Sequence, residues 1–139
     1  MKKNEPIAKI MSSDVVAIQA GQKLSEVRHL MAEGNIHHVP VLEGRKLVGL
    51  VSFTDMMKLN FVISGADERT IDAIIDQQFD IRAIMSTRLV TLPVTASVRE
   101  ASELLAKGEF HSLPVVDADD QLAGIVTSTD LIRYLNDQY

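Results

Sequence analysis

The stretch GNIHHVPVLEGRKLVGLVSFTD, from Gly34 to Asp55, decides the fold because the chain contains it twice. A degenerate second copy, GEFHSLPVVDADDQLAGIVTSTD, runs from Gly108 to Asp130. Each copy begins with glycine, carries a Pro-Val pair and ends in a hydroxyl residue, two further residues and an aspartate. Two related structural units are therefore expected.

The repeat extends upstream of this stretch. IAKIMSSDVVAIQAGQKLSEVRHLMAEGNIHHVPVL, from Ile7, aligns with IRAIMSTRLVTLPVTASVREASELLAKGEFHSLPVV, from Ile81, at an offset of 74 residues. Between Leu42 and Leu47 the offset becomes 75, in a turn that tolerates an insertion. We predict a first unit at residues 7–58, a connector with a helix at 59–80, and a second unit at 81–135.

Hydrophobic patterning predicts the order β-α-β-β-α in each unit. A short strand rich in branched residues opens each unit, at 15–18 and 89–92. Apolar residues at helical spacing follow it. A hairpin comes next, with strands at 38–42 and 47–52 in the first unit and at 112–116 and 122–127 in the second. A final helix begins near Ser52 or Thr127. The helical stripes are Leu24, Val27, Leu30 and Met31, and Val98, Ala101, Leu104 and Leu105.

Several residues are typical of helix ends. Gly34 and Gly108 are predicted to end the first long helix of each unit in a left-handed conformation. Ser97 and Glu100 have the spacing of a capping box, and Thr70 is predicted to cap the connector helix.

Gly49 and Gly124 interrupt apolar strands. Glycine weakens a strand unless another group approaches its backbone closely. We predict that this group is a neighbouring helix or an adenine ring.

Composition limits the functional classes. With 139 residues, of which 46% are hydrophobic, the chain can form an ordinary hydrophobic core that needs no disulfide or metal ion to stabilise it. No cysteine is present for a disulfide or a thiolate metal site. The net charge of -5 argues against nucleic-acid binding. No signal-peptide pattern opens the chain, and its apolar runs are shorter than the roughly 20 residues of a membrane span. A cytoplasmic, soluble protein with no nucleic-acid or membrane partner is expected.

The patterns Ser52-x-x-Asp55 and Thr127-x-x-Asp130 lie where a strand turns into a helix. Backbone N–H groups at a helix start favour anions such as phosphate. A hydroxyl there can donate to phosphate, and a nearby carboxylate can accept the hydroxyls of a ribose. The same spacing also describes a capping box that only starts the helix. Both interpretations remain open at this point.

Histidines precede the Pro-Val strands, as His37-His38 in one unit and His111-Ser112 in the other. An imidazole can donate to phosphate, although a half-exposed histidine at a strand start is the structural alternative. Adjacent histidines on a strand point to opposite faces, and no carboxylate or cysteine lies at ligand spacing, so no metal site is predicted. The nucleophile elbow, the Walker loop and the dinucleotide fingerprint are all absent, and no enzymatic activity is predicted.

The segments IMSSDVVAI and IMSTRLVTL, GNIHHVPVL and GEFHSLPVV, and LVGLVSFTD and LAGIVTSTD together resemble a tandem pair of cystathionine-β-synthase (CBS) domains, a Bateman module. The resemblance extends from Ile7 to Leu135. It implies an α/β (α+β) fold of two β-α-β-β-α units, related by a pseudo-twofold axis and packed sheet to sheet. It also implies two clefts between the units, which in many members bind AMP, ADP, ATP or S-adenosylmethionine.

The resemblance also implies roles for individual residues. Asp55 and Asp130 would hold ribose hydroxyls. The groups near phosphate would be Ser52, Thr127, His37, His111, Thr54, Thr129, His38 and Ser112. The main chain that reads the adenine edge would be Val16, Ala17, Ile18, Val90, Thr91 and Leu92. The residues that pack on the ring would be Ile36, Val39, Pro40, Phe110, Leu113 and Pro114.

One departure from the family concerns the phosphate end of the clefts. Many nucleotide-binding members place arginine after the histidine, whereas this sequence has His38 and Ser112. Arginine binds phosphate bidentately and stays charged, which His and Ser do not do reliably. Binding of a monophosphate, or occupation of only one of the two clefts, is therefore an alternative to triphosphate binding. Charge from elsewhere would come from Arg45, Lys46, Lys58, Arg88 or Arg133.

The function implied is a standalone regulatory or sensor module. It would bind an adenine nucleotide as a regulatory ligand and signal its occupancy to an unidentified effector protein. The family often forms homodimers through its helices. Met56, Met57, Leu131 and Ile132 fit such an interface or, equally, an internal core. The alternative function is a ligand-free structural dimerisation or adaptor module.

Overall fold

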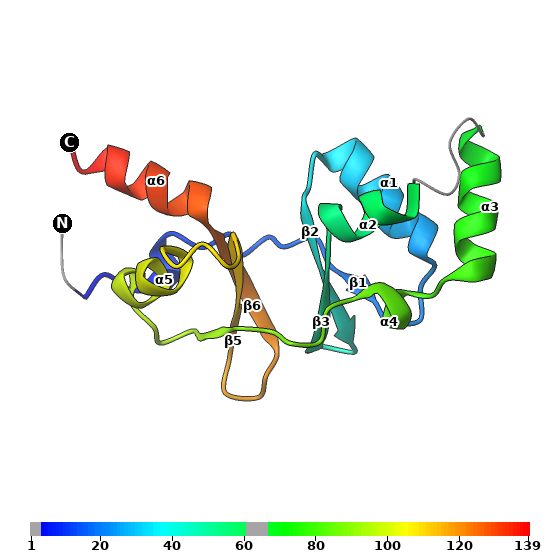
Figure 1. Cartoon of the computed structure of the whole chain (residues 1–139). Helices are drawn as coiled ribbons and strands as arrows, with labels where there is room; N and C mark the ends of the chain where they lie inside the picture. Colours follow the sequence, from blue (N-terminus) through cyan, green and yellow to red (C-terminus); the bar gives the residue numbers. More distant parts are fainter. Residues whose placement is uncertain (1–3, 61–66) are drawn as a thin grey trace. The chain divides into compact units, whose positions relative to one another are not determined.

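The structure, a computed structural model, describes residues 4–60 and 67–139 (Figure 1). The chain divides into two compact units. One is continuous, residues 16–89, and is called the mid-chain unit. The other combines the chain up to Val15 with Val90–Tyr139, and is called the terminal unit.

The mid-chain unit is built on a three-stranded sheet with the order β1-β2-β3. Its strands are β1 (Ile18–Gln19), β2 (His38–Glu43) and β3 (Lys46–Ser52). β1 runs parallel to β2, with Ile18 opposite Val41. β2 and β3 form the predicted hairpin, in which His38 lies opposite Ser52.

Four helices complete the described part of the mid-chain unit (Figure 1): α1 (Leu24–Gly34), α2 (Phe53–Asn60), α3 (Glu68–Gln78) and α4 (Ile81–Ile84). The stripe predicted for α1 faces the core, because Leu24 and Val27 are fully buried and Met31 is 6% exposed. The core of this unit consists of Ile18, Ala20, Leu24, Val27, Met31, Val39, Val41, Val51, Met56, Leu59, Ile75 and Ile81.

Polar contacts attach the connector helix α3 to α1. The Asp76 carboxylate accepts hydrogen bonds from the backbone N–H of Ser25, at 2.9 Å, and from its hydroxyl, at 2.7 Å. One turn away, Asp72 accepts from Arg28 at 2.8 Å and contacts the Nε2 atom of His29 at 2.7 Å. The hydrogen bond to Asp72 raises the pKa of His29. Burial alone would raise the pKa of Asp72, but hydrogen bonds from Arg28 and His29 outweigh it and lower that pKa.

The terminal unit repeats the same sheet, with the order β4-β5-β6. Its strands are β4 (Leu92–Pro93), β5 (Ser112–Val116) and β6 (Leu122–Thr127), and its helices are the short 3-10 helix η1 (Ile7–Lys9), α5 (Val98–Leu105) and α6 (Ser128–Asp137). β4 is parallel to β5, which is antiparallel to β6. The core consists of Ile7, Leu92, Ala96, Val98, Ala101, Leu105, Leu113, Val115 and Val126. Each repeat therefore shows the predicted order β-α-β-β-α.

The opening segments of the two repeats are exchanged between the units. In the terminal unit, Ser12 of the first repeat exchanges backbone hydrogen bonds with Ile125 of the second, both at 2.9 Å. In the mid-chain unit, Ser86 of the second repeat does the same with Leu50 of the first, at 2.9 and 3.1 Å. The compact units consequently have different boundaries from the repeats at 7–58 and 81–135.

This exchange explains the two glycines inside strands. The side chain of Met85 lies where a Cβ atom on Gly49 would stand. The Met11 side chain and the carbonyl oxygen of Ser12 do the same at Gly124. The predicted close approach is therefore present in each unit, and it is made by the residues that follow a short helix.

Four of the predicted helix ends can be compared with the structure. Asn35, with φ of 51°, takes the left-handed position expected of Gly34. Gly108 has the expected positive φ, 77°, but α5 already ends at Leu105, so Gly108 lies beyond the helix end. The cap of α3 is Asp67 and not Thr70, because the Asp67 carboxylate accepts from the Thr70 N–H at 2.8 Å. Ser97 caps α5 as predicted, accepting from the backbone N–H of Glu100.

Candidate functional site

Each strand-to-helix junction is closed by a reciprocal pair of hydrogen bonds. At the start of α2, the Ser52 N–H donates to Oδ2 of Asp55 at 2.9 Å, and the Asp55 N–H donates to the Ser52 hydroxyl oxygen at 3.1 Å. At the start of α6, Thr127 and Asp130 make the same two bonds at 2.8 and 3.1 Å. The capping-box interpretation is therefore confirmed at both positions, while ribose binding by these carboxylates stays a prediction.

The capping bonds leave one oxygen of each carboxylate for other partners. Oδ1 of Asp130 lies 3.4 Å from Nη1 of Arg133, one helical turn further along α6. Within residues 4–60 and 67–139, Oδ1 of Asp55 accepts no hydrogen bond. Both side chains are oriented by the helix start, so an incoming hydroxyl group would meet a fixed acceptor.

The histidines predicted near phosphate lie beside these junctions. The His37 carbonyl oxygen accepts the Phe53 N–H at 2.7 Å, and the His111 carbonyl oxygen accepts the Ser128 N–H at 3.0 Å. Both histidines are exposed. The His37 ring stacks on Phe53, with centroids 5.4 Å apart. The sequence analysis missed Phe53, although an aromatic residue directly after Ser52 was the available signal.

The remaining predicted phosphate groups have different surroundings. His38 and Ser112 lie opposite Ser52 and Thr127 in their hairpins. Ser112 is 5% exposed. Thr54 and Thr129 are exposed on the first turns of α2 and α6. In each unit, the structure therefore brings the histidine, the hydroxyl residue and the aspartate to one end of a hairpin.

The residues predicted to contact adenine divide into core and surface. Val39 and Leu113 are fully buried in the cores of their own units, and Pro40 and Pro114 are buried beside them. Ile36 and Phe110 are partly buried against the same cores. Val16 and Val90 are 40% and 41% exposed, Ala17 and Thr91 are at least partly exposed, and Ile18 and Leu92 are buried at the start of each sheet. Their contact with a base stays a prediction.

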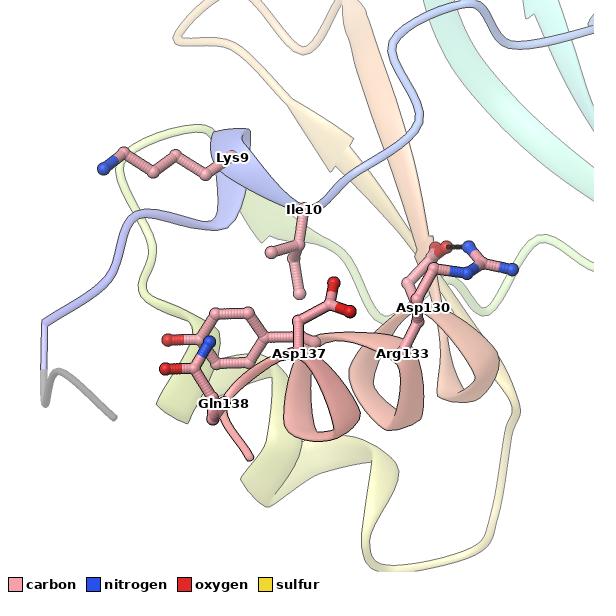
Figure 2. Close-up of a pocket in the computed structure, with 7 residues that line it drawn as sticks. Lys9, Ile10, Asp130, Arg133, Asp137 and Gln138 are labelled. Atoms are coloured by element: carbon pink, nitrogen blue, oxygen red, sulfur yellow. Dashed lines mark hydrogen bonds and ion pairs between the residues drawn. The ribbon is translucent and has the colours of Figure 1, made fainter.

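A pocket of about 320 Å³ lies beside Asp130 in the terminal unit (Figure 2). Most of its lining comes from one face of α6, with residues spaced by three or four positions, and the rest comes from η1. The sequence analysis missed this pocket because η1 reaches it only through the exchange of opening segments. The lining residues are Lys9, Ile10, Asp130, Arg133, Tyr134, Asp137 and Gln138.

A second pocket, of about 160 Å³, lies in the mid-chain unit. It is mostly apolar and does not include Asp55. Its lining residues are Arg28, Met31, Ala32, Phe53, Met56 and Met57. The two pockets therefore differ in chemistry as well as in position within their units.

Neither a metal cluster nor a membrane-spanning helix occurs in residues 4–60 and 67–139. No three His, Cys, Asp or Glu side chains there come together as a metal site would require. None of the helices in this part of the chain has the length and apolar character of a membrane span.

Comparison with known families decides the classification. The CBS domain profile matches the chain twice, at residues 7–61 and 81–137. The chain belongs to the CBS domain family. Each CBS match contains one copy of the Pro-Val hairpin and one Ser/Thr-x-x-Asp junction.

Curated relatives share this region over different fractions of their length. The CBS domain-containing protein YhcV of Bacillus subtilis is 31% identical over 121 residues, which cover 87% of this chain and 79% of YhcV. The first relatives matched are longer, and the aligned region spans only 47%, 33% and 22% of them. The chain thus spans about half or less of those relatives.

Solved structures share the fold over nearly the whole chain. CBSX2 in complex with AMP has a TM-score of 0.80 and 22% identity, with 96% of this chain and 98% of CBSX2 covered. The CBS domain pair of protein MJ0100, in complex with 5-methylthioadenosine and S-adenosyl-L-methionine, has a TM-score of 0.77 and 23% identity, with 98% of this chain and 99% of that pair covered. The predicted fold is confirmed.

Proposed function

We propose that this CBS pair is a regulatory module that binds an adenine nucleotide or S-adenosylmethionine and signals its occupancy to a partner protein. The observation that carries the proposal is the duplicated junction, in which a fixed aspartate lies beside a hydroxyl residue and an exposed histidine. Solved CBS pairs of the same fold support it, since CBSX2 is described with AMP and the MJ0100 pair with S-adenosyl-L-methionine.

In this proposal, Asp55 and Asp130 accept ribose hydroxyls through Oδ1. Ser52, Thr127 and the exposed His37 and His111 approach the phosphate. Thr54, Thr129, His38 and Ser112 complete the polar side. The adenine would contact the main chain at 16–18 and 90–92 and apolar residues at 36–40 and 110–114.

Ligand-induced stabilisation tests the proposal. A ligand at a hundredfold excess over its Kd stabilises the fold by about 2.7 kcal/mol. We expect one or more of AMP, ADP, ATP and S-adenosylmethionine at millimolar concentration to raise the Tm by several degrees. Asp55→Asn and Asp130→Asn each reduce this shift, whereas Asp119→Asn, in the exposed turn between β5 and β6, leaves it unchanged. No shift with any of the four compounds rejects nucleotide binding.

A second candidate function is a dimerisation adaptor with empty clefts. It is favoured by exposed apolar side chains on α2 and α6: Phe53 is 44% exposed, Met57 46%, Ile132 66% and Leu135 41%. Apolar side chains gathered on a helix face are typical of interaction surfaces. A homodimer through these helices is proposed for either function, and analytical ultracentrifugation of Met57→Gln and Ile132→Gln would detect its loss. An adaptor would dimerise without any nucleotide-induced shift.

Catalysis by this module is not part of the proposal. The inosine-5'-monophosphate dehydrogenase of Thermoplasma acidophilum is 32% identical over 123 residues, but the aligned region is only 22% of that enzyme. We therefore propose a regulatory role in the cytoplasm, without turnover. Release of ADP or AMP during incubation with ATP would contradict it.

A further inference from the structure

Asp55 and Asp130 occupy equivalent places in the two repeats but have different neighbours. In each, Oδ2 accepts the backbone N–H at the junction, at 2.9 and 2.8 Å, so Oδ1 is the atom left for a ligand hydroxyl. Arg133 forms an ion pair with Oδ1 of Asp130. Among the described residues, no basic side chain forms an ion pair with Asp55. The two acceptors are therefore not equivalent.

The ion pair between Arg133 and Asp130 is weak. The Arg133 side chain is 67% exposed, whereas that of Asp130 is 11% exposed, and a single contact of 3.4 Å joins them. Exposed pairs of this kind contribute little to stability. The guanidinium retains further N–H donors in a planar fork that matches phosphate. Arg133 can therefore leave Asp130 when another anion is offered nearby.

The pocket beside Asp130 restricts where such an anion would lie. Figure 2 shows Asp130 and Arg133 side by side at one end of the pocket, with Asp137 at the end of α6 and Gln138 directly after it. The Asp137 carboxylate disfavours an anion at its own end of the pocket, and the ammonium group of Lys9, the other basic residue of the lining, pairs with Glu5 at 3.0 Å. A negatively charged group is therefore favoured at the Arg133 end, next to the carboxylate proposed to hold ribose.

We infer that Arg133 makes the Asp130 site selective for adenosine ligands that carry a 5′-phosphate over uncharged adenosine; the inference rests on the proposed function. A ribose hydroxyl replaces Arg133 as the hydrogen-bond partner of Oδ1 of Asp130. The Arg133 guanidinium then binds the phosphate. Uncharged adenosine also displaces Arg133 from Asp130, but it has no anionic group that the guanidinium could bind. At the Asp55 site the equivalent position is Lys58, which forms no ion pair with Asp55 in the described part of the chain, so the inference is confined to the Asp130 site.

Isothermal titration of AMP and of adenosine tests the inference. An Asp55→Asn background confines the measurement to the Asp130 site. There we expect AMP to bind about tenfold more tightly than adenosine, the effect of one charge-assisted contact. Adding Arg133→Gln removes this difference by weakening AMP alone. Arg133→Lys retains part of it. Arg99→Gln is the matched control, because Arg99 is 66% exposed and pairs with Glu103 within α5 of the same unit.

The outcomes separate the inference from the proposed function. Equal weakening of AMP and adenosine by Arg133→Gln overturns the inference, as does an unchanged AMP affinity. If the unmodified protein binds none of AMP, ADP, ATP and S-adenosylmethionine, the proposed function itself fails. Circular dichroism melts accompany each titration. Should Arg133→Gln not fold, the ratio of AMP to adenosine affinity in Arg133→Lys decides, and a ratio equal to that of the parent rejects the inference.

Discussion

The Sδ atom of Met11 lies 2.6 Å from the position of a Cβ atom on Gly124, and the carbonyl oxygen of Ser12 lies 2.8 Å from the same point. One neighbour is a flexible side chain and the other is backbone held in a bridge to Ile125. At Gly49, in contrast, the three nearest atoms all belong to the Met85 side chain. The two equivalent glycines therefore have different tolerance for a methyl group.

We expect Gly124→Ala to lower the free energy of unfolding by about 1–3 kcal/mol, the usual cost of overpacking. Gly49→Ala should cost less, because Met85 can move aside. Gly21→Ala is the control, since nothing lies within 4 Å of its added Cβ atom. Urea unfolding of the three variants gives the comparison, and an equal cost at Gly49 and Gly124 would contradict it.

Removal of the junction hydroxyls is expected to weaken the helix starts. Ser52→Ala and Thr127→Ala each delete the acceptor of one capping bond and should cost about 1 kcal/mol. Thr127→Ser keeps the hydroxyl group and should retain most of the stability. Thermal melts without ligand check this, and a neutral Thr127→Ala would mean that the capping box contributes nothing measurable.

The contacts between α1 and α3 predict a dependence of stability on pH. The pKa of His29 is raised above its ordinary 6.5 by the hydrogen bond to Asp72, with further influence from Arg28 and Glu33. Its contribution is therefore fully present below that ordinary value and is lost as the pH rises through the higher folded pKa. For Asp72, whose pKa is lowered, the contribution is present above the ordinary 3.8 and is lost as the pH falls through the folded pKa.

The measurement compares unfolding midpoints at about pH 5.5 and about pH 8.5, on either side of a histidine titration. Between the lower and the higher pH, the His29→Gln variant should lose less stability than the unmodified protein. Asp72→Asn should be less stable at both, by about 1–2 kcal/mol, because Arg28 and His29 lose their charged partner. An identical pH dependence in the protein and in His29→Gln would refute the assignment.

Ile7 tests the exchange of opening segments. It is fully buried in the terminal unit, and its N–H donates to the Ala96 carbonyl oxygen at 2.9 Å. Ile7→Ala should cost about 2–5 kcal/mol, as expected for a buried isoleucine. Hydrogen exchange should show the resulting loss of protection in β5 and β6, while β2 and β3 keep theirs. Loss confined to β2 and β3 would contradict the segment's assignment to the terminal unit.

Local patterns in the sequence predicted the hairpins well. The strands at 112–116 and 122–127 have the observed bounds, and those at 38–42 and 47–52 differ from them by one residue. Short apolar runs joined by turn residues are local patterns, so one repeat contains enough information to predict its hairpin. The opening strands were less accurate, because only Ile18–Gln19 and Leu92–Pro93 pair, later than the branched runs indicate.

The candidate site was only partly predictable. The Ser/Thr-x-x-Asp spacing identified the two junctions, since a capping box is a local arrangement. The proximity of each junction to His37 or His111 could be predicted as well, because the two strands of a hairpin bring these positions together. The contribution of Lys9 and Ile10 to the pocket beside Asp130 could not, because it depends on a contact between residues more than a hundred positions apart. Of the pocket's lining residues, the sequence singled out Asp130 and Arg133, and it gave no partner for their face of α6.

The exchange of the Ile-Met-Ser segments means that neither repeat is complete by itself. A single repeat would leave the outer edge of its last strand open, because the segment that covers this edge here belongs to the other repeat. Separating the two repeats would therefore uncover both edges at once.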